Sequence, residues 1–213
     1  VGWHDSVANT VNIQINDGTV DSVSFSAGGR DGTAGFAIGT NGSAAAVFMD
    51  GRIAQVLIWK RALSAEEKTY LYNGGNGRLW LPGTRTASGL RQSIALSDNL
   101  RGYWLLNEAS GTRSDISGQG NNLTDNNTVT GATGPSSILP LASQFTSANS
   151  ESLSIADNAS LSMGAGVRMS VQAWVYIDAK PTNATLTILS KWATGVGLAS
   201  IYTHACTDIR TPA

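Results

Sequence analysis

Apolar and polar residues alternate along several short segments of this chain, with the period of a β-strand. The clearest is 167–178, VRMSVQAWVYID. One face carries Val167, Met169, Val171, Ala173, Val175 and Ile177, and the other carries Arg168, Ser170, Gln172, Trp174, Tyr176 and Asp178. Alternation of this kind is typical of a strand with one face towards a core. We therefore predict a strand over 167–178.

Two other segments place apolar residues on both faces. The first is 52–60, which contains Ile53, Val56, Leu57, Ile58 and Trp59, and the second is RGYWLLNE, which begins at Arg101. Strands covered on both sides by other layers have this composition. Both segments are therefore predicted to be buried strands.

A hairpin and a helix have recognisable local signals. Segments 10–16 and 19–25 flank Asp17-Gly18, a pair that favours the positive φ angles of a type I′ turn. Ser64 with Glu67 forms a capping box, which predicts a helix starting after Ser64. The helix is expected to end at 73–75, Asn-Gly-Gly, because glycine adopts the left-handed terminal conformation most easily.

Short strands joined by turns, with a single short helix, indicate the all-β class. Spacing of this kind is typical of a sandwich or barrel. We predict a two-sheet antiparallel jelly-roll sandwich.

Composition excludes several partners. Charged residues make up 14% of the chain and the formal net charge is −1, so there is no electrostatic footprint for nucleic acid. No apolar run approaches the roughly 20 residues of a membrane helix, which predicts no membrane insertion. Cys206 is the single cysteine, so no internal disulfide can form.

Four stretches resemble laminin G-like domains of the concanavalin A-like lectin/glucanase superfamily. DGRIAQVLIWKRALSAEEKTYLYNGGNGR resembles their closing strand and helix, and GWHDSVANTVNIQINDGTVDS resembles their middle hairpin. NLRGYWLLNEASGTRSDISGQGNNLTDNNTV resembles the opening of such a domain, and MSVQAWVYID with TILSKW resembles the strands that come after that opening. Together these stretches cover most of 1–80 and 99–192.

The order of the stretches implies a junction between two tandem repeats. Residues 1–80 would be the C-terminal half of one unit, 81–98 a connector, and 99–213 the N-terminal half of the following unit. We expect the halves to pack as one sandwich, circularly permuted relative to the family, with 102–107 pairing beside 53–59. In the alternative arrangement, each half stays incomplete.

The resemblance implies a non-catalytic carbohydrate-binding or adhesion module, a lectin-like part of a tandem-repeat surface protein. Its partners would be a glycan or cell-surface polysaccharide and neighbouring repeats of the same chain. The setting would be extracellular or surface-associated, including the surface of a virion. The alternative is a structural spacer in an extracellular or virion fibre protein, without a ligand of its own. A glycosidase, or a domain appended to one, is the third and least favoured alternative.

The glutamates argue against glycoside hydrolysis. Relatives that hydrolyse β-glucans carry a ladder of carboxylates on one strand, and retaining enzymes hold two carboxyl groups about 5–5.5 Å apart. The glutamates of this chain are Glu66, Glu67, Glu108 and Glu151, and none lies in an alternating acidic strand. We therefore predict that the protein is not an enzyme.

The polar face of 167–178 is the predicted ligand site. Gln172, Trp174 and Tyr176 project from one side of this strand, and aromatic rings beside amides suit the apolar face and the hydroxyls of a sugar. In the alternative interpretation, Trp174 packs under a loop or against the other sheet.

A calcium site is the second prediction. Some laminin G-like domains bind calcium at a rim of loops, and calcium requires oxygen ligands. The loop DISGQGNN supplies Asp115 and Asn121 as candidate ligands. Ordinary turn chemistry explains the same residues.

Overall fold

A computed structural model describes residues 1–26, 32–41, 47–82, 95–164, 166–178, 187–193 and 196–198. These residues form antiparallel strands in two sheets, together with short helices. The strands of the first part of the chain are β1 (Gly2–Asp5), β2 (Thr10–Gln14), β3 (Val20–Ser24), β4 (Phe36–Ile38) and β5 (Gly51–Trp59). The later strands are β6 (Leu100–Trp104), β7 (Thr124–Asn126), β8 (Thr130–Thr133), β9 (Leu141–Phe145), β10 (Ser152–Ile155), β11 (Met169–Ile177), β12 (Leu189–Ala193) and β13 (Val196–Leu198). The helices are α1 (Ala65–Tyr72) and the 3-10 turns η1 (Asn73–Gly75), η2 (Ser147–Asn149) and η3 (Ala159–Leu161).

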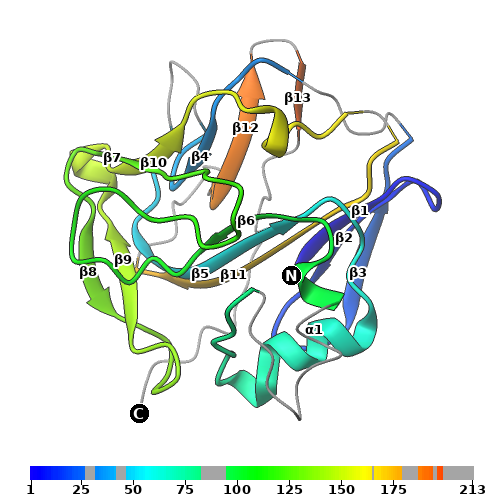
Figure 1. The fold of residues 1–213 in the computed structure, drawn as a ribbon, viewed down its shortest axis with the longest axis horizontal. Helices are drawn as coiled ribbons and strands as arrows, with labels where there is room; N and C mark the ends of the chain where they lie inside the picture. The colour runs from blue at the N-terminus through cyan, green and yellow to red at the C-terminus, as the bar shows by residue number, and fades with distance from the viewer. Residues whose placement is uncertain are drawn as a thin grey trace.

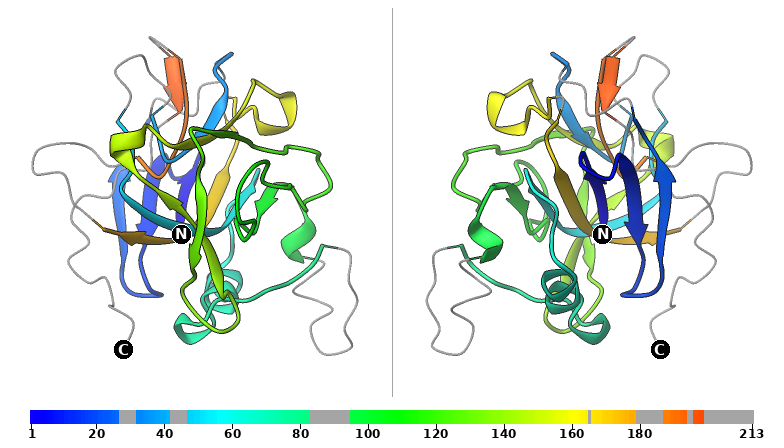
Figure 2. Two further views of the ribbon diagram at one scale, coloured as in Figure 1. Left: turned by 90° about the vertical axis from the view of Figure 1, so that its left-hand side faces the viewer. Right: turned by 90° about the vertical axis from the view of Figure 1, so that its right-hand side faces the viewer.

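The two sheets face each other across the main core. In the described residues, the larger sheet has the order β3-β2-β1-β11-β5-β9-β8, with β6 also paired to β5. The smaller sheet has the order β13-β12-β4-β10-β7. Figure 1 shows the smaller sheet on one side of β5 and β11 and α1 on the other, and both side views agree (Figure 2). The protein is therefore an all-β, two-sheet structure, as predicted.

Strand β5 is buried on both faces, which confirms the prediction from its composition. Ile53, Val56 and Ile58 belong to the core between the sheets. Leu57 and Trp59 point the other way, into a second apolar layer beneath α1. Burial of apolar groups on both faces is the main source of stabilisation available to such a strand.

The predicted pairing between β5 and the strand after the connector is present. Leu57 lies opposite Tyr103, and Ile58 lies opposite Gly102. The N-terminal end of β5 pairs with β9 instead, where Ile53 lies opposite Ser143. One edge of β5 is thus shared by two strands, and the larger sheet forks between β6 and β9.

A bulge marks the position of this fork. The register between β5 and β11 shifts between Gln172 and Trp174, and the residue in β5 that absorbs the shift is Gln55, with φ 48°. Leu106, just beyond β6, also has a positive φ of 59°. The backbone N–H of Gln55 donates to the carbonyl of Leu105 over 3.0 Å. Bulges bend a strand and redirect its side chains, and here β6 separates from β5 at the bulge.

The side chain of Arg113 joins the long loop after β6 to β9. It is fully buried, and its Nε donates to Ser143 Oγ on β9 over 3.1 Å. Its Nη2 donates to the carbonyl of Val129 over 2.7 Å. Burial lowers the pKa of Arg113, while the nearby charges of Asp125 and Glu108 oppose that shift. A buried charge with bonds to several segments holds the long loop after β6 against β9.

The helix begins and ends at the predicted residues, but its left-handed cap is an asparagine. Ser64 and Glu67 form the predicted capping box. The left-handed residue at the C-terminal cap is Asn73, with φ 51°, rather than a glycine. Asparagine tolerates this conformation, and Asn73 Nδ2 also donates to the carbonyl of Gly77 over 2.7 Å.

The first hairpin is present, but its turn lies one residue earlier than predicted. Asn16 and Asp17 have φ values of 51° and 55°, and the N–H of Gly18 donates to the carbonyl of Ile15 over 2.9 Å. The two central residues of the type I′ turn are therefore Asn16-Asp17, because asparagine and aspartate accept positive φ.

The strand predicted over 167–178 is present and turns the predicted apolar face towards the core. The observed strand is shorter than the predicted one at both ends. Strand β11 covers Met169–Ile177, and Val171 lies in the main core with Ala173 and Val175 packed against it. Strand β12, Leu189–Ala193, falls at the end of the TILSKW stretch, and 179–186 lie outside the described residues.

Strands from both sides of 81–98 contribute to each sheet. The pairs β5–β6, β1–β11 and β4–β10 all join a strand before this segment to one after it. The division into 1–80, 81–98 and 99–213 stays a prediction about repeats. In the described residues, no helix has the length and apolar character needed to span a membrane.

Candidate functional site

The three predicted ligand residues share the outer face of β11 but have different surroundings. Gln172, Trp174 and Tyr176 occupy alternate positions of this strand. Gln172 is 5% exposed, whereas Trp174 and Tyr176 are half-buried. The row is therefore not one open platform.

Trp174 packs beneath the segment that follows α1. Its indole stacks on the ring of Tyr72, with 5.9 Å between centroids and 13° between planes. A Cβ atom added at Gly77 would lie 3.1 Å from Trp174 Nε1, so any other residue there would crowd the indole. The tryptophan thus adopts the alternative position, packed under a connecting segment.

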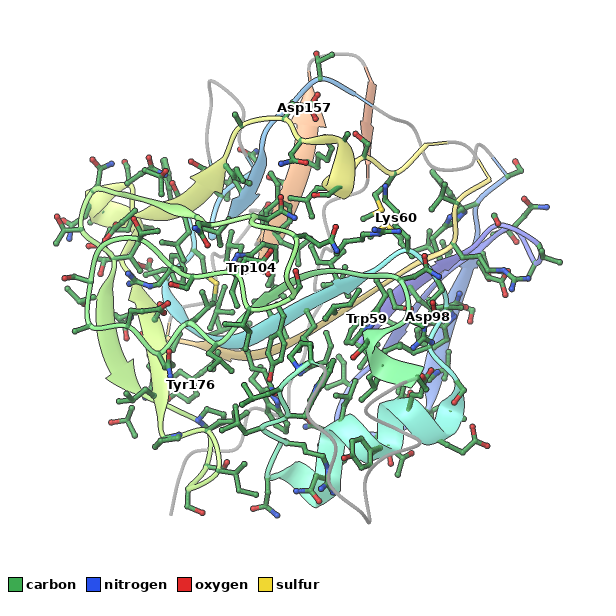
Figure 3. The ribbon with its side chains drawn as sticks, viewed as in Figure 1. Trp59, Lys60, Asp98, Trp104, Asp157 and Tyr176 are labelled. Carbon is green, nitrogen blue, oxygen red and sulfur yellow. The ribbon has the colours of Figure 1, made fainter. Side chains whose placement is uncertain are left out.

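Tyr176 lies at the end of the row, beside polar side chains from two other strands. The guanidinium carbon of Arg52 lies 4.0 Å from the centroid of the Tyr176 ring, and these two residues are cross-strand partners. Gln144 on β9 is the partner of Arg52 and donates through Nε2 to Asp178 Oδ2 over 2.8 Å. We call Arg52, Gln144, Tyr176 and Asp178 the Tyr176 patch. Figure 3 shows Tyr176 towards β9, while Asp157 lies on the side of the smaller sheet.

Sequence reasoning did not find Arg52 and Gln144. Arg52 lies in a strand that the sequence predicted to be buried, and nothing local indicated that β5 and β9 would lie beside Tyr176. Only the cross-strand register brings these side chains together.

The predicted calcium ligand Asp115 is used by the turn around it. Its Oδ1 accepts from the N–H groups of Tyr103 at 3.0 Å and Ser117 at 2.9 Å. Its Oδ2 accepts from the N–H of Asn121 and the hydroxyl of Ser117, each at 2.9 Å. These bonds fix the loop against β6.

Asn121 is fully buried beside Asp115 and holds two segments together. Its Nδ2 donates to the carbonyl of Arg101 and to Ser160 Oγ, each over 2.7 Å. The described residues contain no group of three or more His, Cys, Asp or Glu side chains that could hold a metal ion. Calcium binding at Asp115 and Asn121 stays a prediction.

The glutamates have separate partners. Glu67 accepts two hydrogen bonds of 2.7 Å from the guanidinium of Arg61. Glu108 Oε1 accepts from the N–H of Ser114 over 2.8 Å, and Glu151 Oε2 accepts from the N–H of Thr146 over 2.8 Å. These contacts give each of the three a structural role, and the prediction that the protein is not an enzyme stays untested.

Comparison of the chain with protein-family models, with curated proteins and with solved structures found no match.

Proposed function

We propose that this protein is a non-catalytic carbohydrate-binding module of an adhesion protein, and that the sugar contacts the Tyr176 patch. The carrying observation is the Tyr176 ring stacked on the guanidinium of Arg52 from the paired strand β5, with the amide of Gln144 on β9 bonded to the carboxylate of Asp178 just after β11. Ring carbons suit the C–H face of a sugar, and planar polar groups suit its hydroxyls. Paired strands hold such groups more rigidly than loops do.

Gln172 and Trp174 would extend this site along β11. Trp174 has a stacking partner in Tyr72, so it supports the row next to Tyr176 rather than presenting both ring faces. Gln172 is buried on the same face of β11 and would support the row from within the protein. On this proposal the contact surface is small, and weak sites of this kind gain strength when modules are linked in tandem.

A structural spacer without a ligand is the second candidate function. The same burial of Gln172 and the same stacking of Trp174 on Tyr72 favour it, because both residues then serve only to hold α1 on the sheet. On this alternative, Arg52 and Tyr176 form a cross-strand pair that stabilises the sheet edge.

The family affiliation is part of the proposal. We infer a laminin G-like domain with a permuted jelly-roll order, from a tandem-repeat protein in an extracellular or surface setting. The support is the resemblance of four stretches, together with a two-sheet antiparallel fold in which β5 lies beside β6. Fold and resemblance do not fix a ligand, so the choice rests on binding data.

A glycan array tests the two candidates. Wild-type protein is expected to bind a subset of glycans, and Tyr176→Ala is expected to lose that binding. Tyr70→Ala is a matched control, since it removes another arginine–tyrosine stack, with Arg78 at 4.1 Å, on α1 instead of β11. Absence of binding to every glycan would overturn the proposal in favour of the spacer. Equal loss in both variants would also count against the Tyr176 patch.

A further inference from the structure

Three polar atoms on the outer face of the larger sheet are buried without a hydrogen-bond partner in the described part of the chain. They are Oε1 of Gln55, Oε1 of Gln172 and Nε1 of Trp174. Gln55 is 0% exposed and Gln172 is 5% exposed. Two are acceptors and one is a donor, so the group as a whole has complementary hydrogen-bonding capacity.

The register at the β5 bulge places these three side chains at neighbouring positions of two paired strands. Gln172 lies opposite Leu57, and Trp174 lies opposite Ala54, so Gln55 falls in the interval between the two pairs. Cross-strand and diagonal neighbours on one face of a sheet lie within reach of long side chains. The three side chains therefore point into one layer, between the sheet and the segment that follows α1.

Contacts of the same side chains show which face they occupy. Gln55 Nε2 donates to the carbonyl of Arg78 over 2.5 Å and to the hydroxyl of Tyr103 over 3.1 Å. Trp174 stacks on Tyr72. Tyr72 is the last residue of α1 and Arg78 lies in the segment that follows it, so Gln55 and Trp174 lie beneath this part of the chain.

Reversing the amide of Gln55 does not remove the unpartnered oxygen. In the present orientation, Nε2 makes both hydrogen bonds, one to the carbonyl of Arg78 and one to the hydroxyl of Tyr103. After a reversal, Oε1 would face the carbonyl oxygen of Arg78, and two acceptors would oppose each other. The orientation is therefore fixed by its neighbours, and Oε1 requires a different donor.

We propose that this layer contains a structural water site, in which water donates to the amide oxygens of Gln55 and Gln172 and accepts from the indole N–H of Trp174. Water both donates and accepts, and buried waters in proteins usually make about three bonds to groups of this kind. A buried acceptor without any partner carries a desolvation penalty, which such bonds remove. The site accounts for polar side chains at the centre of an otherwise apolar layer. It does not depend on sugar binding.

A crystal structure at a resolution that shows ordered water tests the site directly. We expect a water oxygen about 2.7–3.2 Å from both Gln55 Oε1 and Gln172 Oε1. Absence of water at both amide oxygens would overturn the proposal.

Thermal unfolding of Gln172→Met gives an independent test. Methionine keeps the approximate volume but cannot accept from water, so the midpoint is expected to fall as the water loses one of its partners. A rise would contradict the proposal, because removal of an acceptor with no partner stabilises a protein. Gln119→Met, at an exposed position, is the control and is expected to leave the midpoint unchanged. If Gln172→Met does not fold, the wild-type crystal structure decides.

Discussion

Gln55 on β5 donates a hydrogen bond of 3.1 Å to the hydroxyl of Tyr103 on β6, a residue 48 positions later in the chain. The bond joins the last strand before segment 81–98 to the first strand after it. Both residues are fully buried, and burial raises the pKa of Tyr103 to about 12, so the phenol stays neutral over the ordinary pH range. The two parts of the chain are thus joined in the interior of one sheet.

This contact predicts that the chain unfolds as one unit. Urea denaturation is expected to give coincident transitions by tryptophan fluorescence and far-ultraviolet circular dichroism. Tyr103→Phe should lower the free energy of unfolding by about 1–2 kcal/mol, because the Gln55 amide loses one of its acceptors. Tyr176→Phe, at a half-buried position, should have a smaller effect. Two separate transitions in the wild type would contradict the prediction.

Replacement of Arg113 should be strongly destabilising. Arg113→Met leaves Asp125 and Glu108, whose carboxylate oxygens lie 4.0 and 3.9 Å from the guanidinium, without their buried cation. We expect a loss of about 3 kcal/mol in the free energy of unfolding. The matched control is Arg168→Met, which removes a 3.2 Å ion pair with Asp5 at the surface and should cost less than about 1 kcal/mol. Equal effects of the two changes would contradict the role assigned to Arg113.

Alanine substitutions at two glycines distinguish the cost of a steric clash from the cost of backbone strain. Gly39 has φ 81°, and an added Cβ would lie 2.5 Å from Phe145 Cδ1 in the core. Gly74 has φ 62° with nothing within 4 Å of the same position. Gly74→Ala should cost only the left-handed strain, about 1 kcal/mol, whereas Gly39→Ala should cost clearly more in urea denaturation. Similar losses would show that Phe145 moves aside.

The Glu67 carboxylate makes stability depend on acid pH. Burial tends to raise its pKa, but hydrogen bonds from Arg61 and the Ser64 N–H outweigh burial and hold the pKa below its ordinary value of 4.5. A lowered pKa in the folded state means that this stabilisation is present above 4.5 and is lost as pH falls through the folded-state pKa. Glu67→Gln should therefore flatten the decline of the urea midpoint at acid pH. An unchanged decline would contradict this assignment.

Local signals predicted much of the fold. The capping box at Ser64 and Glu67, the hairpin near Asp17 and the faces of β11 each depend on residues close together in the sequence. The burial of β5 on both faces was also predictable, since its composition leaves no polar side.

The remaining features depend on contacts between distant segments. The fork at Gln55, the burial of Arg113 and the cover that Tyr72 forms over Trp174 all arise from strand order, which no local pattern encodes. For the same reason, the sequence predicted that Gln172, Trp174 and Tyr176 share a face and offered packing of Trp174 under a loop as an alternative, but it did not predict the neighbours Arg52 and Gln144. Asp115 illustrates the limit most simply, because a turn and a calcium ligand use the same carboxylate.

Nuclear magnetic resonance titration with a glycan identified on the array tests the proposed site most directly. We predict that the largest chemical-shift changes fall on the backbone amides of Arg52, Gln144 and Tyr176, and that they disappear in Tyr176→Ala. Changes confined to the loop of Asp115 and Asn121, with the Tyr176 patch unaffected, would contradict the proposed site.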